Sequence, residues 1–69
     1  GPRCSDPDTH EGDAALYCVE GPVTVNLVDL EESFVLEPED TFFIPAGVKY
    51  QLVNFENHPV KTVFAITKL

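Results

Sequence analysis

The sequence of 69 residues predicts a single all-β domain, on three observations. From Ala14 onward, short runs rich in Val, Leu, Ile, Phe and Thr follow one another. Turn signals separate these runs at intervals of about eight to twelve residues, which is typical of sandwiches and barrels. Apolar and polar residues also alternate inside several runs, as in strands that bury one face. Because every connection is short, we expect antiparallel strands, since a parallel return needs about a dozen residues.

Glycine, proline, asparagine or an acidic pair bounds each of the expected strands. Their ranges are 14–20, 23–30, 33–36, 41–44, 48–55 and 60–67. Side chains two apart on a strand share a face, so two sets should point into the core. These sets are Val23, Val25 and Leu27 in one strand and Tyr50, Leu52 and Asn54 in another.

The first residues differ in composition from the rest. Residues 1–13 hold prolines, glycines and acidic residues but no large aliphatic side chain, so we expect a flexible leader there. Gly1 and Pro2 match the remnant that a tag-removing protease leaves. The domain proper is expected at residues 14–69.

Several strands are apolar on both faces, which indicates a covered outer surface. A domain of this size has a small core that rarely supplies more than about 3–5 kcal/mol of net stability. A second sheet or a second subunit could cover the outer face, and we favour a homodimer. The expected interface residues are those whose strand neighbours fill the core: Tyr17, Val19, Val28, Leu30, Val63 and Ala65.

Charge excludes some classes of partner. The chain has 4 Lys and Arg residues against 12 Asp and Glu residues, a formal charge of −8, so it should repel nucleic acids and anionic membranes. No run approaches the roughly 18 apolar residues of a membrane span and no signal peptide is evident, so we expect a soluble, intracellular domain. We expect Cys18 to be a buried free thiol and Cys4 to be incidental. His10 and His58 are expected to be solvated in loops rather than to share a metal.

Residues 39–54, EDTFFIPAGVKYQLVN, resemble the second sequence motif of the cupin family. In that motif a Gly-Asp pair precedes a strand and then P-x-G-x-x-H-x-x-x-N. Asp40, Phe42, Pro45, Gly47 and Asn54 match it. We expect Gly47 to take a positive φ in a tight turn that Pro45 leads into, and Asn54 to satisfy backbone groups near a corner of the barrel. Glu39 stands in place of the usual glycine, and Tyr50 in place of the histidine. The resemblance implies a small antiparallel, jelly-roll-like cupin barrel, truncated because the chain is short for this fold.

The cupin metal site should be missing. The first cupin motif supplies two histidines and a glutamate, and no H-x-H occurs in this chain. We therefore expect no metal and no cofactor, with Tyr50 as a core aromatic whose hydroxyl bonds to a neighbour. Ser5 and Ser33 have no histidine nearby in the sequence, and no phosphate loop or G-x-S-x-G occurs, so no catalytic residue is predicted. The acidic residues Glu31, Glu32, Glu37, Glu39 and Asp40 are interpreted as a solvated rim.

A tyrosine at the histidine position is similar to the C-terminal cupin of the centromere protein C family. The matching residues are Phe42, Ile44, Pro45, Gly47, Tyr50 and Asn54, followed by a final strand. The resemblance implies a non-catalytic homodimerisation module of a kinetochore scaffold, located at the centromere in the nucleus. It further implies contacts with other centromere or histone-loading proteins.

Two other functions stay open at this stage. A small cupin with isomerase, epimerase or related activity would use Tyr50 as a polar group in the barrel and Asn54 to orient a ligand. A storage-like or sensor cupin would bind a small ligand without catalysis. The expected interior residues offer only a phenol for chemistry: Val25, Leu27, Phe42, Ile44, Tyr50, Leu52 and Phe64.

Overall fold

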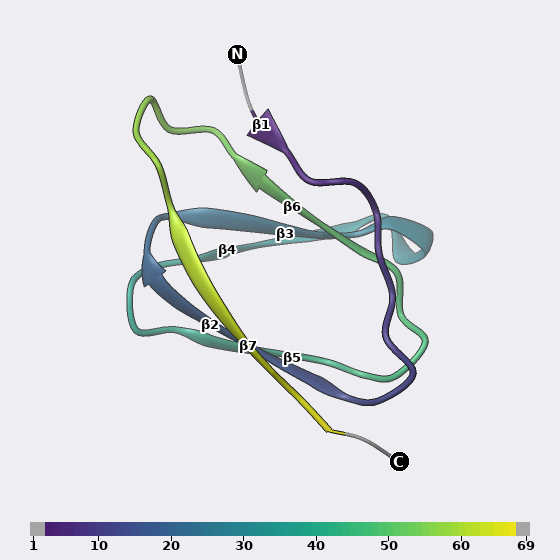
Figure 1. Ribbon diagram of the computed structural model, residues 1–69. Helices are drawn as coiled ribbons and strands as arrows, with labels where there is room; N and C mark the ends of the chain where they lie inside the picture. Colours follow the sequence, from purple (N-terminus) through teal and green to yellow (C-terminus); the bar gives the residue numbers. More distant parts are fainter. Residues whose placement is uncertain (1–2, 68–69) are drawn as a thin grey trace.

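Two antiparallel sheets face each other in the computed structural model, which describes residues 3–67 (Figure 1). The elements are β1 (Arg3–Cys4), β2 (Ala14–Glu20), β3 (Val23–Leu27), the 3₁₀ helix η1 (Val28–Leu30), β4 (Glu32–Leu36), β5 (Thr41–Ile44), β6 (Tyr50–Asn54) and β7 (Lys61–Ile66). The all-β prediction is therefore confirmed. The predicted tag remnant, Gly1 and Pro2, lies outside the described residues. No helix within residues 3–67 has the length and hydropathy needed to cross a membrane.

The strand order is β1-β6-β3-β4 in one sheet and β5-β2-β7 in the other. Every pairing is antiparallel, as predicted. Of the strands that follow one another in the sequence, β3 and β4 pair directly, whereas the links β1–β2, β2–β3, β4–β5, β5–β6 and β6–β7 cross from one sheet to the other. This crossing gives the jelly-roll-like barrel, because each short link closes the space between the sheets.

The core lies between the two sheets and contains alternate residues of each strand. Its buried members are Ala14, Leu16, Cys18, Val23, Val25, Leu27, Leu36, Ile44 and Tyr50. Phe42, Leu52 and Phe64 are partly buried and pack against this cluster. All seven residues predicted to fill the barrel therefore do so. The predicted burial of the free Cys18 thiol is also confirmed, and Cys4 is exposed.

The strand predicted at residues 23–30 ends earlier than expected. It stops at Leu27, and Val28–Leu30 form η1. Glu31 then takes a left-handed conformation (φ 54°), which ends the helix and turns the chain back into β4. Val28 N–H donates to the Lys49 carbonyl at 3.1 Å, so this turn is fixed to the start of β6. The apolar pattern of Val28 and Leu30 was misread as a continuing strand.

The leader prediction is wrong for residues 3–13, which we call the strap. β1 pairs with β6, matching Arg3 to Asn54 and Cys4 to Val53. Farther along, Asp8 and Tyr50 exchange two backbone hydrogen bonds of 2.9 Å. In Figure 1 the strap runs from β1 down beside the β5–β6 link to the start of β2. Composition missed this order because backbone groups at the free edge of β6, rather than apolar side chains, hold the strap.

The turn between β4 and β5 places Glu39 where glycine is preferred. Asp40 N–H donates to the Glu37 carbonyl at 3.0 Å, and Glu39 has φ 79°. With Pro38 before it, Glu39 occupies the third position of a type II turn, which requires a positive φ. Any residue with a Cβ atom is strained there by about 1–2 kcal/mol.

We therefore expect Glu39→Gly to raise the free energy of unfolding by about 0.5–1 kcal/mol, after the extra chain entropy of glycine is subtracted. Urea denaturation at fixed protein concentration measures it. Glu39→Gln removes the charge but keeps the Cβ atom and is the matched control. A gain from Glu39→Gln as large as that from Glu39→Gly would assign the effect to charge and contradict the strain argument.

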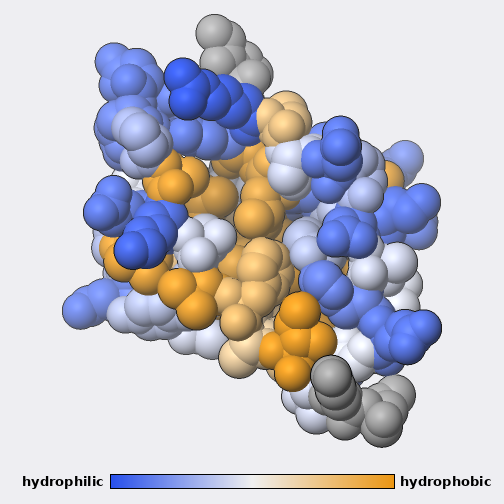
Figure 2. Space-filling view, viewed as in Figure 1, coloured by the Kyte–Doolittle hydropathy of each residue, from blue (hydrophilic) through white to orange (hydrophobic). Residues whose placement is uncertain are grey.

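Hydrophobic surface remains outside the core. On the side drawn in Figure 2 it gathers in a band through the middle of the view, where β7 lies in front in Figure 1, with hydrophilic surface on both sides. Val63 of β7 points away from the core, on the side opposite to Phe64, and is 50% exposed. The second sheet therefore covers only one of the two apolar faces of these strands.

Candidate functional site

The motif at residues 39–54 forms β5, a tight turn and β6. Val48 N–H donates to the Pro45 carbonyl at 3.2 Å, and Gly47 has φ 80°, as the sequence predicts for this glycine. Asn54, at the other end of β6, holds the next turn: its Nδ2 donates to the His58 carbonyl at 2.9 Å, and its Oδ1 accepts from Glu56 N–H at 2.8 Å. The predicted backbone role of Asn54 is therefore confirmed.

The remaining residues of the motif have structural contacts. Asp40 Oδ2 accepts from Glu37 N–H at 2.9 Å and closes the turn before β5. Ile44 is buried against Ala14 of β2, its partner in the sheet. Phe42 packs on Phe34 of β4 with ring centroids 5.0 Å apart, which bridges the two sheets at the side where β4 and β5 lie. These contacts account for the motif as a framework for the barrel.

Tyr50 is the polar group inside the barrel, and its partner is His10. The Tyr50 side chain is only 5% exposed. Its hydroxyl shares a hydrogen bond of 2.7 Å with His10 Nε2. Both rings also contact Phe64, with centroid distances of 5.6 Å from Tyr50 and 5.9 Å from His10. The prediction that the Tyr50 hydroxyl bonds to a neighbour is confirmed, whereas the prediction of a solvated His10 is wrong.

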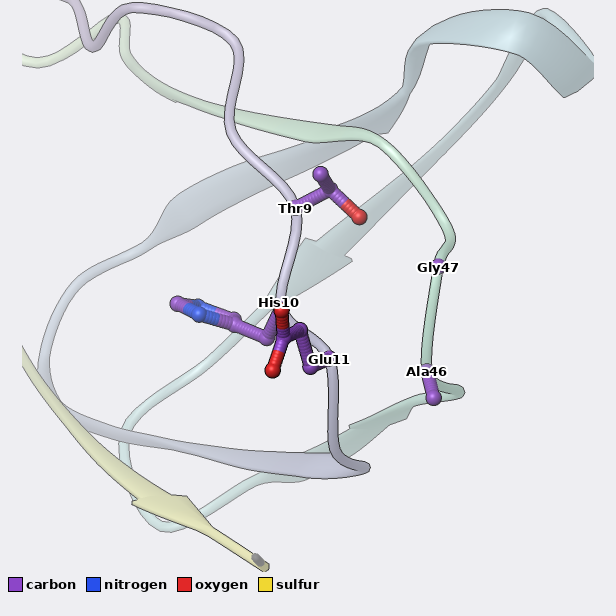
Figure 3. A pocket seen from close by; sticks show the side chains of 5 residues that line it. All are labelled: Thr9, His10, Glu11, Ala46 and Gly47. Atoms are coloured by element: carbon purple, nitrogen blue, oxygen red, sulfur yellow. The ribbon is translucent and has the colours of Figure 1, made fainter. Parts of the chain in front are cut away.

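The strap brings His10 to this position. The Gly47 N–H donates to the His10 carbonyl at 2.9 Å, and the Ala46 N–H donates to Asp13 Oδ1 at 2.9 Å. An open concavity of about 640 Å³ lies between strap and turn, lined by Thr9, His10, Glu11, Ala46 and Gly47. In Figure 3 the His10 imidazole extends away from Ala46 and Gly47. The ring therefore faces the barrel interior rather than the concavity.

Chemically, the interior offers an imidazole and a phenol. Burial, and to a smaller extent the charge of Asp8, raises the pKa of Tyr50 above its ordinary value, so the phenol keeps its proton at neutral pH. Within residues 3–67, no group of three or more His, Cys, Asp or Glu side chains is arranged to hold a metal ion. The pair His10 and Tyr50 occupies the interior at the place where the cupin motif has a metal-binding histidine.

A protein-family model described as "Cupin domain" matches residues 2–66. The chain belongs to the cupin family. The match includes the strap, in agreement with its pairing to β6. Neither the comparison with curated proteins nor that with solved structures gives a match.

The second candidate site of this cupin domain is the outer face of the sheet β5-β2-β7. Tyr17 of β2 lies opposite Val63 of β7, and Ala15 lies between Phe43 and Ala65 of the two neighbouring strands. Residues opposite each other in a sheet point to the same side, so these five side chains form one apolar surface. Val19 continues it along β2 and is also exposed. We call these six residues the apolar face.

Of the predicted interface residues, four lie on the apolar face: Tyr17, Val19, Val63 and Ala65. The structure does not bring Val28 and Leu30 to it, because η1 joins strands of the other sheet. Phe43, 58% exposed, and Ala15 were missed. Phe42 and Phe43 must point to opposite sides of their strand, because successive residues alternate. Both are aromatic, however, so the sequence did not indicate which of the two faced outward.

The outer face of the other sheet is mostly polar, and Val35 of β4, opposite Thr24, is its large exposed apolar side chain. Val23, Val25 and Leu27 of β3 are buried, so the alternate residues Thr24 and Asn26 point outward. Asn26 exchanges hydrogen bonds with its neighbours on both sides: its Nδ2 donates to Gln51 Oε1 at 3.5 Å, and its Oδ1 accepts from the Ser33 hydroxyl at 3.3 Å. Such side chains are satisfied by each other and by water. The two outer faces of this cupin domain therefore differ, and one of them lacks a polar surface.

We expect Tyr50→Phe to lower the free energy of unfolding by about 1–2 kcal/mol, because it leaves the half-buried His10 nitrogen without a partner. Tyr17→Phe is the matched control, since it removes a hydroxyl from the surface. His10→Ala should cost less in the Tyr50→Phe background than in the wild type, with a coupling of about 1 kcal/mol measured by urea denaturation. Equal losses from the two Tyr→Phe changes would contradict the assignment.

Stability should fall at alkaline pH. Burial raises the pKa of the Cys18 thiol above its ordinary value of 9.0, and the carboxylates of Asp40 and Glu37 add to the shift. The unfolded thiol ionises first as the pH rises past 9.0, so this contribution to stability is fully present below that pH and is lost above it. The pKa of Tyr50 is also raised by burial, so its contribution to stability is likewise lost as the pH rises above the ordinary tyrosine pKa of 10.0.

Urea denaturation at pH 8, 9 and 10 measures this decline. In Cys18→Ala the loss of unfolding free energy between pH 8 and 10 should be smaller than in the wild type, whatever the change in absolute stability. If the free energy of unfolding falls equally with pH in both proteins, ionisation of Cys18 does not cause the loss of stability at alkaline pH.

Proposed function

We propose that this cupin domain is a non-catalytic homodimerisation and protein-interaction module. The observation that supports it is the apolar face, whose Val63 and Phe43 side chains are 50% and 58% exposed in the single chain. Exposed apolar clusters that are bordered by polar residues commonly mark interaction sites. On the outer face of the other sheet the exposed Val35 lies among Thr24, Asn26 and Ser33 rather than in an apolar cluster, so the apolar face is the surface that association would cover.

The size of the domain fits this function. A stable interface buries about 800 Å² per partner, which is roughly one-sixth of the 4596 Å² exposed by the single chain. The apolar face spans three strands and can supply much of that area. Pairing by a two-fold axis would place the same face of both copies in contact, with Tyr17 and Val63 near its centre. Covering these residues would add buried area to a core that is small.

The motif supports a more specific role. Phe42, Ile44, Pro45, Gly47, Tyr50 and Asn54 resemble the C-terminal cupin of the centromere protein C family. On this proposal the domain joins two copies of a longer kinetochore scaffold at centromeric chromatin in the nucleus. Joining two copies makes the second nucleosome contact intramolecular, which raises avidity by about 10²–10⁴-fold.

The proposed partners are therefore a second copy and other centromere or histone-loading proteins. With a formal charge of −8, the domain itself is not proposed to bind nucleic acid or a membrane. Chromatin would be bound by other parts of the scaffold.

The hydrogen bond between His10 and Tyr50 favours a second candidate, a small-molecule-binding or isomerase-type cupin. An imidazole beside a protonated phenol is a base and an acid within 2.7 Å, the arrangement that proton transfer to and from a ligand requires. His10, however, fills the space next to Tyr50 with its own ring, and Phe64 covers both. A ligand would have to displace the strap, so we rank this candidate second.

Light scattering across a dilution series tests the proposal. We expect a mass of twice 7.6 kDa that persists to low micromolar concentration. The mass of one chain at that concentration would overturn the homodimer. Native mass spectrometry of the same sample tests the second candidate, because a retained small molecule or ion would add to the mass of the chain.

A further inference from the structure

A second exposed apolar site lies along β4, away from the apolar face. β4 is the last strand of its sheet and has β3 as its neighbour, so among residues 3–67 no strand pairs with the other side of its backbone. Phe34, 38% exposed, lies on the inner side of β4 opposite Val25 and packs on Phe42 where the two sheets meet, whereas Val35, 61% exposed, points to the outer side. Phe42 and Phe43 point to opposite sides of β5, so this site does not share side chains with the apolar face.

Charge distinguishes this edge from the others. Asp29, Glu31 and Glu32 lie at the start of β4, and Glu37, Glu39 and Asp40 lie just after its end. In Figure 1 these two groups are at opposite ends of the strand, in η1 and in the β4–β5 turn. No Lys or Arg occurs between Arg3 and Lys49, so β2, β3, β4 and β5 contain no basic residue, and Lys49 is joined to η1 through its carbonyl, which accepts from Val28 N–H. The edge of β7, by contrast, begins with Lys61.

We propose that the free edge of β4 binds an extended protein segment with Lys or Arg at both ends of a short apolar run. The segment adds a strand to β4, and its backbone hydrogen bonds supply affinity as in other cases of strand addition. One face of the segment places apolar side chains on the Phe34–Phe42 pair. Its basic ends meet the two acidic groups, which are about 16 Å apart for a strand of 5 residues at about 3.3 Å per residue.

The geometry sets which segments bind. A helix cannot use the free backbone groups of β4, and a segment with proline in its middle lacks the N–H groups that pair with them. An acidic segment is repelled from both ends. Because the charges are exposed, we expect weak binding at low salt, with a dissociation constant of about 10–100 µM, that weakens further as salt is added.

Fluorescence polarisation with a labelled peptide, Lys-Arg-Thr-Val-Thr-Val-Thr-Lys-Arg, tests the proposal on the intact chain. We expect Glu32→Lys combined with Glu37→Lys to weaken binding at least tenfold and to allow binding of the peptide with glutamate in place of each basic residue. The matched control is Asp6→Lys combined with Glu20→Lys, which changes the net charge equally at exposed positions outside β4 and its flanking turns. A peptide with proline at the central position should not bind wild-type protein.

Three results would overturn the proposal: no binding of the basic peptide at 1 mM, equal loss in the two charge variants, or binding of the proline peptide. Amide chemical shifts add a positional readout, since changes should centre on residues 32–36 and changes centred on β7 would reject the site. Light scattering of the same variants should give the wild-type mass. Loss of peptide binding in a chain of unchanged mass therefore separates this site from the proposed dimerisation.

Discussion

Val63→Asp is expected to convert the proposed dimer into a folded monomer. In the proposed interface Val63 would lie near the centre, beside Tyr17 of the neighbouring strand. A carboxylate there would be removed from water, and the one basic residue of β7, Lys61, lies at the end of the strand, at the edge of the proposed interface. Burial of an unpaired charge costs several kcal/mol, so we expect dimerisation to weaken at least a hundredfold. Light scattering at micromolar concentration measures the loss.

Val35→Asp is the matched control for this change. Val35 is also an exposed valine on an edge strand, 61% exposed against 50% for Val63, but it lies outside the apolar face. Both variants lose the same β-propensity, so both should keep the β-sheet circular dichroism spectrum. If Val63→Asp unfolds, Phe43→Ser on the same face provides a milder change. A dimer that survives both Val63→Asp and Phe43→Ser would place the interface elsewhere.

The sequence predicted what depends on local pattern. Alternation identified the interior positions of β3 and β6, because a strand fixes the side of each residue relative to the next. Gly47 and Pro45 identified a turn whose geometry needs a positive φ, and the structure has it. The framework part of the candidate site was therefore predictable from residues close together in the chain.

What the sequence did not predict depends on contacts between distant segments. His10 and Tyr50 are 40 residues apart, and their hydrogen bond exists because the strap follows β6. The strap is polar, so composition indicated disorder, while its order comes from backbone pairing that composition does not report. Val28 and Leu30 were misplaced for a related reason, since the Val28 N–H bonds to Lys49 across the end of the barrel.

Gly21→Ala is expected to destabilise the domain by about 2 kcal/mol or more, because no space exists for a side chain in the β2–β3 turn. A Cβ atom on Gly21 would lie 2.7 Å from Cys18 Sγ, 3.1 Å from Val23 N and 3.2 Å from the Leu36 carbonyl oxygen. The last two are backbone atoms of paired strands β3 and β4, which cannot retreat without disturbing the sheet. Overpacking of this kind costs about 1–3 kcal/mol.

For a domain of this size, a loss of 2 kcal/mol corresponds to a decrease in Tm of about 10 °C. Thermal denaturation measures it, at one protein concentration because the Tm of a dimer depends on concentration.

Gly47→Ala is the control: no heavy atom lies within 4 Å of its Cβ position, so only the positive φ opposes it, at about 1 kcal/mol. Cys18→Ala removes the sulfur contact and should reduce the cost of Gly21→Ala without abolishing it, since the two backbone contacts remain. Full recovery in the double variant would assign the entire penalty to the sulfur, and no loss in Gly21→Ala would show that the turn can open to admit a methyl group.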